Sequence, residues 1–267
     1  MTCSLYAQRI ISTAPSNTEI ISALGYADKL IAVDPYSSKI PGVPQGLPLI
    51  DFASPNAEAI VAMQPDIIFA SEINRSGAGD DPFKLLREMG IHIIYIPTAN
   101  SIKDIYSDIN QIAQSLHAEP KGRAIVQGMQ AELASIAAVG KTIRQKKKVY
   151  WEVSSFPNPV SFGSGVYLNE IIELVGAENI FAKEKGWFSP SAENIIIANP
   201  DVILEMFYEA GNTASQGLAR RPGFQVIKAV KNKALYMIDA DSASRTSPGI
   251  VKAIKEVAHS VYPEYYD

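Results

Sequence analysis

The sequence predicts an α/β protein with two Rossmann-like lobes, each built on a parallel sheet, joined by one long bridging helix. Three observations predict it. Short apolar segments alternate with helical segments along most of the chain, one long helical pattern divides it near the middle, and a stretch before that pattern recurs after it. We therefore predict a first lobe at residues 1–118, a bridging helix at 119–147 and a second lobe at 148–267.

The first lobe begins with a strand and continues in alternation. Strands are predicted at the short apolar segments Arg9–Ser12, Leu30–Val33, Ile67–Ala70 and Ile91–Ile96. Helices are predicted between them, with Ser16 and Glu19 as a capping box, Ser54-Pro55 and Ser101 as helix starts, and Gly25 and Gly90 as helix ends. Buried strands that alternate with helices are typical of a parallel sheet covered on both faces.

The bridging helix is predicted from Glu119 to near Lys146. Its apolar residues recur at helical spacing, namely Ile125, Met129, Leu133, Ile136 and Ile143. Pro120 suits a first turn, and the basic residues from Lys141 onward suit a last turn, where cations oppose the negative end of the helix dipole. Such a helix would be roughly 35–40 Å long, more than one small lobe requires.

The second lobe is predicted to follow the same plan. Its strands are Lys148–Val153, Asp201–Leu204 and Ala234–Ile238, and its helices are Leu168–Val175, a helix starting at Ser189-Pro190, a helical segment near Gly223–Val230, and a final helix capped by Ser247-Pro248. No role is predicted for the tail Pro263–Asp267.

An internal repeat relates the two lobes. The segment from Ser54 to Ile68 and the segment from Ser189 to Ile203 share Ser, Pro, Ala, Glu, Ile, Pro, Asp and the last Ile at a constant offset (193 − 58 = 200 − 65 = 135). A second repeated segment pairs Glu19-Ile20-Ile21 with Glu170-Ile171-Ile172 (170 − 19 = 151). Ser-Pro is a common start of a helix and Pro-Asp a common end, so these matches alone could arise without duplication. That explanation accounts less easily for the shared Ala-Glu-x-Ile, so we interpret the repeat as duplication of one lobe.

Composition excludes several classes of protein. The chain has 267 residues with 47% apolar content and a net charge of −4, which supports sizeable cores and gives no basic surplus for nucleic acid. The unbroken apolar runs are short of a membrane span, and the single cysteine, Cys3, excludes an internal disulfide. Cys3 is interpreted either as a residue near a lipid-attachment site or as incidental.

Ligand recognition is expected where loops follow the strands, because parallel strands end together at one edge of a sheet. Candidates are the polar and aromatic residues of these loops: Ser16, Asn17, Tyr36, Arg75, Trp151, Trp187, Phe188, Tyr208 and Arg245. Aromatic faces suit a flat or apolar ligand and arginines suit acidic groups, although some of these aromatic residues could instead belong to a core or rim. No metal site and no cofactor are predicted, since the three histidines show no ligand spacing.

These segments together resemble a known family, the metal-chelate substrate-binding proteins of bacterial ABC importers, of the vitamin B12, siderophore and haem type. The resemblance covers essentially the whole chain and depends on Arg9–Ser12, Pro15–Glu19, the two Ala-Glu-x-Ile segments, Gly176–Ile180 and Ser247-Pro248. It implies that a monomer binds one chelate between its lobes and docks on an ABC transporter permease. In that family one glutamate per lobe meets permease arginines, and Glu58 and Glu193 are the matching positions.

The resemblance also implies an extracytoplasmic protein whose export signal is not in this sequence. A corrinoid such as vitamin B12 is preferred to a ferric siderophore or haem, because the candidate residues mix aromatics with few charges. A simpler explanation for either glutamate is stabilisation by the dipole of its helix, worth roughly 0.3–1 kcal/mol. The alternative function is a cytosolic two-lobe enzyme, although the sequence lacks a complete dinucleotide fingerprint, a Walker A lysine and a Gly-x-Ser-x-Gly motif.

Overall fold

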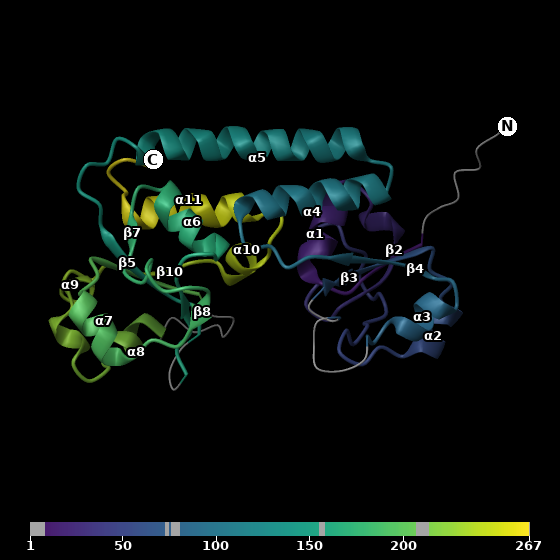
Figure 1. Cartoon of the computed structure of the whole chain (residues 1–267), viewed down its shortest axis with the longest axis horizontal. Helices are drawn as coiled ribbons and strands as arrows, with labels where there is room; N and C mark the ends of the chain where they lie inside the picture. The colour runs from purple at the N-terminus through teal and green to yellow at the C-terminus, as the bar shows by residue number, and fades with distance from the viewer. Residues whose placement is uncertain (1–8, 73–74, 76–80, 155–157, 207–213, 267) are drawn as a thin grey trace. The chain divides into compact units, whose positions relative to one another are not determined.

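The computed structural model describes residues 9–72, 75, 81–154, 158–206 and 214–266, which form two units (Figure 1). Unit 1 comprises residues up to Ala99 together with Lys103–Val126, and unit 2 comprises Asn100–Ile102 and residues from Gln127 onward. Each contains a four-stranded sheet whose strand pairs are all parallel. The division falls inside a single continuous helix, α5 (Glu119–Gly140), so the predicted fold class is confirmed.

Unit 1 is a sheet with helices on both faces. In chain order its elements are β1 (Ile10–Ser12), α1 (Pro15–Ala23), η1 (Ala27–Lys29), β2 (Leu30–Val33), α2 (Ala57–Ala62), β3 (Ile67–Ser71), α3 (Lys84–Glu88) and β4 (His92–Ile96), followed by α4 (Ile102–Ser115). The sheet order is β2-β1-β3-β4. Ile60 of α2 and Leu86 of α3 pack with Ile11 and Ile68 on one face, and α1 and α4 cover the other (Figure 1).

Unit 2 repeats this topology and adds a small antiparallel sheet. Its elements are β5 (Lys148–Glu152), β6 (Ser161–Phe162), α6 (Tyr167–Leu174), β7 (Glu178–Asn179), β8 (Trp187–Phe188), α7 (Ala192–Ala198), β9 (Val202–Glu205), α8 (Ala214–Ala219), η3 (Phe224–Val226), α9 (Lys228–Lys231), β10 (Leu235–Met237), α10 (Ala240–Ser244) and α11 (Ile250–Val261). The main sheet has the order β10-β9-β5-β7, and β6 pairs with β8. Strand β7, the β6–β8 pair, α8 and α10 were not predicted from the sequence.

The duplication is visible in backbone detail. Asp66 accepts the backbone N–H of Arg9 (2.7 Å) before β1, and Asp201, 135 residues later, accepts that of Lys148 (2.9 Å) at the start of β5. Gln64 and Asn199, also 135 residues apart, both adopt the left-handed conformation with φ of 48°. These equivalences support one lobe plan used twice.

The predicted starts of three helices need correction. The N-caps of α2 and α7 are Asn56 and Ser191, two residues after the predicted Ser54 and Ser189, because their side chains accept the N–H groups of Ala59 (3.0 Å) and Asn194 (3.1 Å). Similarly, α11 begins at Ile250, with Gly249 rather than Ser247 at its N-cap.

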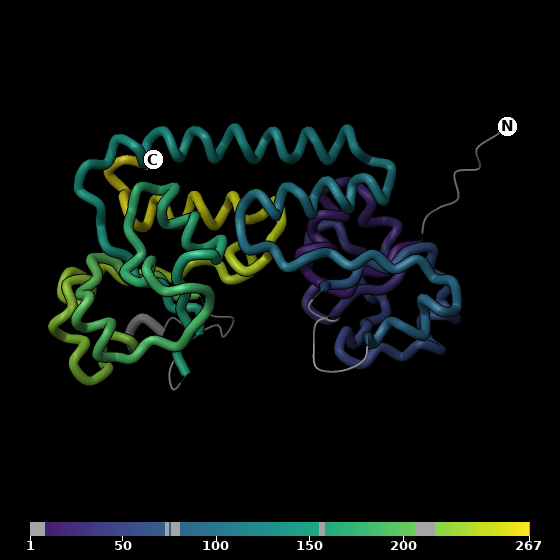
Figure 2. The backbone as a smooth tube through the Cα atoms, viewed as in Figure 1, coloured from purple at the N-terminus to yellow at the C-terminus, as the bar shows by residue number. Residues whose placement is uncertain are grey.

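The bridging helix ends at Gly140 rather than near Lys146. A Cβ atom at Gly140 would lie 2.4 Å from the carbonyl oxygen of Leu174, so the backbones of α5 and the end of α6 are in direct contact there. The chain then turns, with Thr142 and Ile143 donating to Val139 and Gly140. Figure 2 shows the C-terminal segment beside this end of α5, where Tyr266 donates to the carbonyl of Ile136 (3.1 Å). The predicted dipole role of the basic residues from Lys141 onward is therefore wrong.

Candidate functional site

The carboxyl edge of the unit 1 sheet presents one strongly exposed aromatic residue. Tyr36 follows β2 and is 66% exposed. Close to it in the fold, Ser16 is half-buried and Asn17 is buried in the first turn of α1. The Nδ2 atom of Asn17 has no hydrogen-bond partner among the described residues. Three of the predicted ligand residues therefore belong to this one edge.

A buried polar network lies beneath Tyr36. Thr18 of α1 donates to Ser12 at the end of β1 (2.8 Å), and Ser37 is within 2.8 Å of Thr18 and also contacts a carboxylate oxygen of Asp34. The other oxygen of Asp34 accepts the backbone N–H of Tyr36 (2.9 Å). All four network side chains are fully buried. Burial raises the pKa of Asp34, against the opposing effect of the Ser37 hydrogen bond.

Arg75 is engaged within unit 1. Its Nε donates to Glu72 (2.9 Å), and its guanidinium lies 5.0 Å from the centre of the Tyr95 ring. The Tyr95 hydroxyl in turn contacts Asp81, which also pairs with Arg87 (2.9 Å). Burial, followed by the Asp81 hydrogen bond, raises the pKa of Tyr95. Arg75 is half-exposed, so its outer face remains open to an acidic group.

The carboxyl edge of the unit 2 sheet holds two buried glutamates side by side. Glu152 ends β5 and Glu205 ends β9, and they are direct partners in the register of the two strands. Arg221 binds Glu152 through two nitrogens (2.6 and 2.7 Å), and the Tyr150 hydroxyl donates to it (2.9 Å). Both side-chain oxygens of Glu205 are buried and lack a hydrogen-bond partner within the described chain.

The two glutamates therefore differ in their pairing. Burial, followed by repulsion from Glu152, raises the pKa of Glu205 to about 7, and Arg221 only partly offsets this. Arg221 instead neutralises Glu152. Neither glutamate nor the arginine was predicted as a site residue. A glutamate lies at or next to the end of each of the two predicted strands, but Arg221 is 69 residues from Glu152, so no local pattern connects them.

The two tryptophans of the candidate set have different environments. Trp151 is fully buried in β5 and packs against Phe162 (5.8 Å between ring centres), so it belongs to the core rather than to a ligand-contacting surface. Trp187 packs on the same Phe162 (5.7 Å) but is 49% exposed. The placement of Trp151 corrects the prediction, because the β6–β8 pair covers one tryptophan and leaves the other open.

The remaining candidates of unit 2 have smaller exposed surfaces. Phe188 is half-buried against Phe181 (5.2 Å). Arg245 has only 13% of its side chain exposed and pairs with Asp241 (2.8 Å). Tyr208 lies outside the residues that the structure describes. Trp187 is therefore the most accessible of the described candidates in this unit.

Glu58 and Glu193 have matching environments in their own units. Each is exposed and lies in the first turn of its helix, two residues after the N-cap. Both helices are short and end next to the left-handed residues Gln64 and Asn199. Neither carboxylate pairs with another described residue. Such carboxylates are stabilised by the helix dipole and remain available to a cationic partner.

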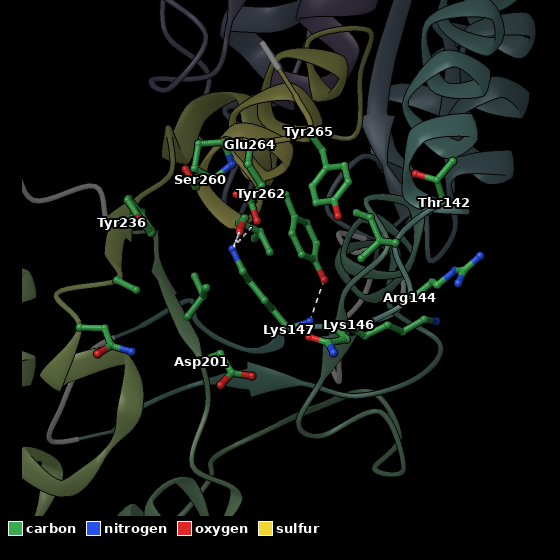
Figure 3. Close-up of a pocket in the computed structure, with 17 residues that line it drawn as sticks. Thr142, Arg144, Lys146, Lys147, Asp201, Tyr236, Ser260, Tyr262, Glu264 and Tyr265 are labelled. Carbon is green, nitrogen blue, oxygen red and sulfur yellow. Dashed lines mark hydrogen bonds and ion pairs between the residues drawn. The ribbon is translucent and has the colours of Figure 1, made fainter.

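A cavity of about 900 Å³ lies at the opposite, amino edge of the unit 2 sheet (Figure 3). The Tyr262 hydroxyl accepts the backbone N–H of Lys147 (2.7 Å), and the Lys147 ammonium donates to Val261 (2.7 Å) and Glu264 (3.1 Å). These hydrogen bonds join polar groups that line the cavity and hold the C-terminal tail against the sheet. The cavity lies at the edge of the sheet away from the predicted ligand-binding loops. The hydrogen bonds in it give the C-terminal tail a structural role, which was not predicted from the sequence.

Among the described residues, no group of three or more His, Cys, Asp or Glu side chains is placed to hold a metal ion. Within the same part of the chain, no helix has the length and apolar character needed to cross a bilayer.

Known proteins resemble this chain over nearly its whole length. An uncharacterized ABC transporter substrate-binding lipoprotein of Bacillus subtilis (strain 168) is 31% identical over 264 residues, which cover 97% of this chain and 81% of that protein. A structure from Staphylococcus epidermidis, described as a possible iron-binding (periplasmic solute-binding) protein, is 30% identical with a TM-score of 0.85, covering 96% of this chain and 98% of that one. The periplasmic vitamin B12-binding protein of Vibrio cholerae is 26% identical with a TM-score of 0.71, covering 96% and 97%. Residues 10–242 match the family described as periplasmic binding protein, and the chain belongs to that family.

Proposed function

We propose that this protein captures a metal chelate outside the cytoplasm and delivers it to the permease of an ABC transporter. One observation carries the proposal: each unit has an exposed glutamate, Glu58 or Glu193, two residues after the N-cap of its helix, and the two positions are 135 residues apart. Two such carboxylates suit two arginines of a membrane partner, since charge-assisted pairs are strong and direct docking. The similarity to a substrate-binding lipoprotein supports this role and weighs against the cytosolic enzyme.

The ligand we propose is a corrinoid such as vitamin B12, ahead of a ferric siderophore or haem. Each unit offers an exposed aromatic residue, Tyr36 in unit 1 and Trp187 in unit 2. An aromatic face can cover a flat chelate with little loss of side-chain entropy, whereas a highly charged chelate would require more unpaired cations. The similarity to a vitamin B12-binding protein supports the same preference.

Ligand binding is tested by titrating the protein with cyanocobalamin, haem and a ferric siderophore, with tryptophan fluorescence as the readout. We expect cyanocobalamin to quench fluorescence, and we expect Trp187→Ala to weaken binding by about 1–3 kcal/mol, as for an aromatic contact. Unchanged affinity in Trp187→Ala would remove this residue from the site. Tight binding of haem or the siderophore alone would overturn the corrinoid preference.

Docking is tested separately with the Glu58→Ala/Glu193→Ala double variant. Since neither glutamate is proposed to touch the chelate, the variant should keep its ligand affinity but fail to support uptake by the reconstituted importer. The matched control is Asp28→Ala/Glu178→Ala, which also removes one exposed carboxylate from each unit. Normal transport by the first variant, or equal loss in the control, would contradict the docking role.

A further inference from the structure

Among the candidate ligand residues that the structure describes, Tyr36 is the most exposed, yet its backbone is held by groups that are completely buried. Its N–H donates to Asp34 (2.9 Å), and the next residue, Ser37, donates its own N–H to the carbonyl of Asp34 (3.1 Å). The N–H of Asp34 is itself bonded to the carbonyl of Ser12 at the end of β1 (3.1 Å). Two bonds to Asp34 therefore close the turn that carries Tyr36, and the backbone of Asp34 joins this turn to β1.

Side chains extend this attachment to α1. The Ser37 hydroxyl lies between Asp34 and Thr18, and the Thr18 hydroxyl is within hydrogen-bonding distance of the Ser12 hydroxyl (2.8 Å) and the Ala14 carbonyl (3.1 Å). The network thus joins the end of β1, the first turns of α1 and the loop after β2. A fully connected buried network resists distortion, because breaking one bond leaves a desolvated polar group.

Unit 2 uses a similar arrangement for a different purpose. There Asn179, at the end of β7, accepts the N–H of Phe181 two residues on (3.0 Å) and donates to Asn169 of α6 (2.9 Å). Asn169 is the counterpart of Thr18 at the offset of the second repeated segment (169 − 18 = 151). The residue held in unit 2, Phe181, is buried in the core, whereas the residue held in unit 1, Tyr36, is exposed. Core packing explains the first case but not the second.

We propose that Asp34 is a positioning residue for Tyr36: with Ser37 and Thr18 it fixes the loop so that the tyrosine ring is preorganised to cover a flat ligand. A fixed loop backbone reduces the entropy lost when the ring is ordered on binding, so the network increases affinity without touching the ligand. The affinity part rests on the function proposed above, whereas the fixing of the loop does not depend on any ligand.

The loop is tested by NMR amide exchange in the ligand-free protein. Asp34→Ala removes the acceptor for the Tyr36 N–H, so exchange at Tyr36 should rise by roughly tenfold or more, with β1 and α1 amides unchanged. Asp34→Asn keeps an acceptor oxygen and should retain the protection. Ser37→Ala keeps Asp34 but removes the hydrogen bond to Thr18, and it should also speed amide exchange at Tyr36. This variant replaces Asp34→Ala if the latter does not fold. The matched control is Asp51→Ala, which removes a comparable turn acceptor for Ala53 in an exposed loop and should leave Tyr36 unaffected.

Affinity for cyanocobalamin is then compared in a double-mutant cycle. Ser37→Ala should weaken binding by about three- to thirtyfold in the parent protein but have little effect in Tyr36→Ala, since the network acts through that ring. Equal weakening in both backgrounds, or unchanged Tyr36 exchange in the network variants, would overturn the positioning role. Failure of the parent protein to bind cyanocobalamin would contradict the proposed ligand, while amide exchange would still decide whether the network fixes the loop.

Discussion

Glu205 should make the stability of unit 2 depend on pH between about 4.5 and 7. Its carboxylate is buried without a hydrogen-bond partner in the described chain, and Arg221 is committed to Glu152. Burial raises its pKa from 4.5 to about 7. Because one pKa unit corresponds to roughly 1.4 kcal/mol, ionisation of Glu205 costs the folded state up to about 3 kcal/mol.

The direction of this change in stability follows from the protonation of Glu205 in the folded and unfolded states. Below about pH 4.5 Glu205 is protonated in both the folded and the unfolded state, so it does not change the free energy of unfolding. Between about 4.5 and 7 the unfolded state ionises while the folded state keeps its proton, so stability falls as pH rises. Above about 7 both states are ionised and the loss is constant.

Glu205→Gln isolates this effect, since the amide has a similar shape but cannot ionise. Urea unfolding should give the variant a stability advantage over the parent that grows from near zero at pH 4.5 to about 3 kcal/mol at pH 8. Other titrating groups are common to both proteins and cancel in the difference. A difference that does not change over this range would show that Glu205 titrates alike in the folded and unfolded states, and the reasoning would fail.

Three further tests concern the packing. Arg221→Met should destabilise unit 2 by about 3–5 kcal/mol in urea unfolding at pH 8, because it leaves Glu152 buried and unpaired; a loss under about 1 kcal/mol would show that the pair matters little. Gly140→Ala should destabilise the protein by about 1–3 kcal/mol through its clash with Leu174, whereas Gly128→Ala on the same helix, with no atom within 4 Å of the added methyl, should stabilise it by up to about 1 kcal/mol. Equal effects of the two glycine changes in thermal unfolding would contradict the close contact. Trp151→Ala should cost about 3–5 kcal/mol as a core truncation, and Trp187→Ala distinctly less because half of its surface is exposed; the reverse order would show that the two tryptophans are wrongly placed.

The sequence by itself determined the lobe plan. The longer strands, the long helix and the duplication were readable because they depend on local patterns: apolar periodicity, helix-capping residues and a repeated segment with a constant offset. The two-residue strands β6, β7 and β8 were not. The same offset carried over to the structure, where Asp66 and Asp201 make equivalent bonds and Glu58 and Glu193 occupy equivalent helix turns. Local patterns specify local conformation, and a duplicated pattern specifies the same topology twice.

Only the tertiary structure decided which side chains are accessible and which are paired. Trp151 and Trp187 were equivalent candidates by sequence, but the β6–β8 pair buries one and exposes the other. The long helix ends at Gly140 because α6 meets it there, although its apolar pattern continues to Ile143. Arg221 reaches Glu152 across 69 residues of sequence, and among the described residues Glu205 has no hydrogen-bond partner. Such features depend on contacts between segments distant in the chain, and burial and pKa follow from those contacts rather than from the spacing of residues.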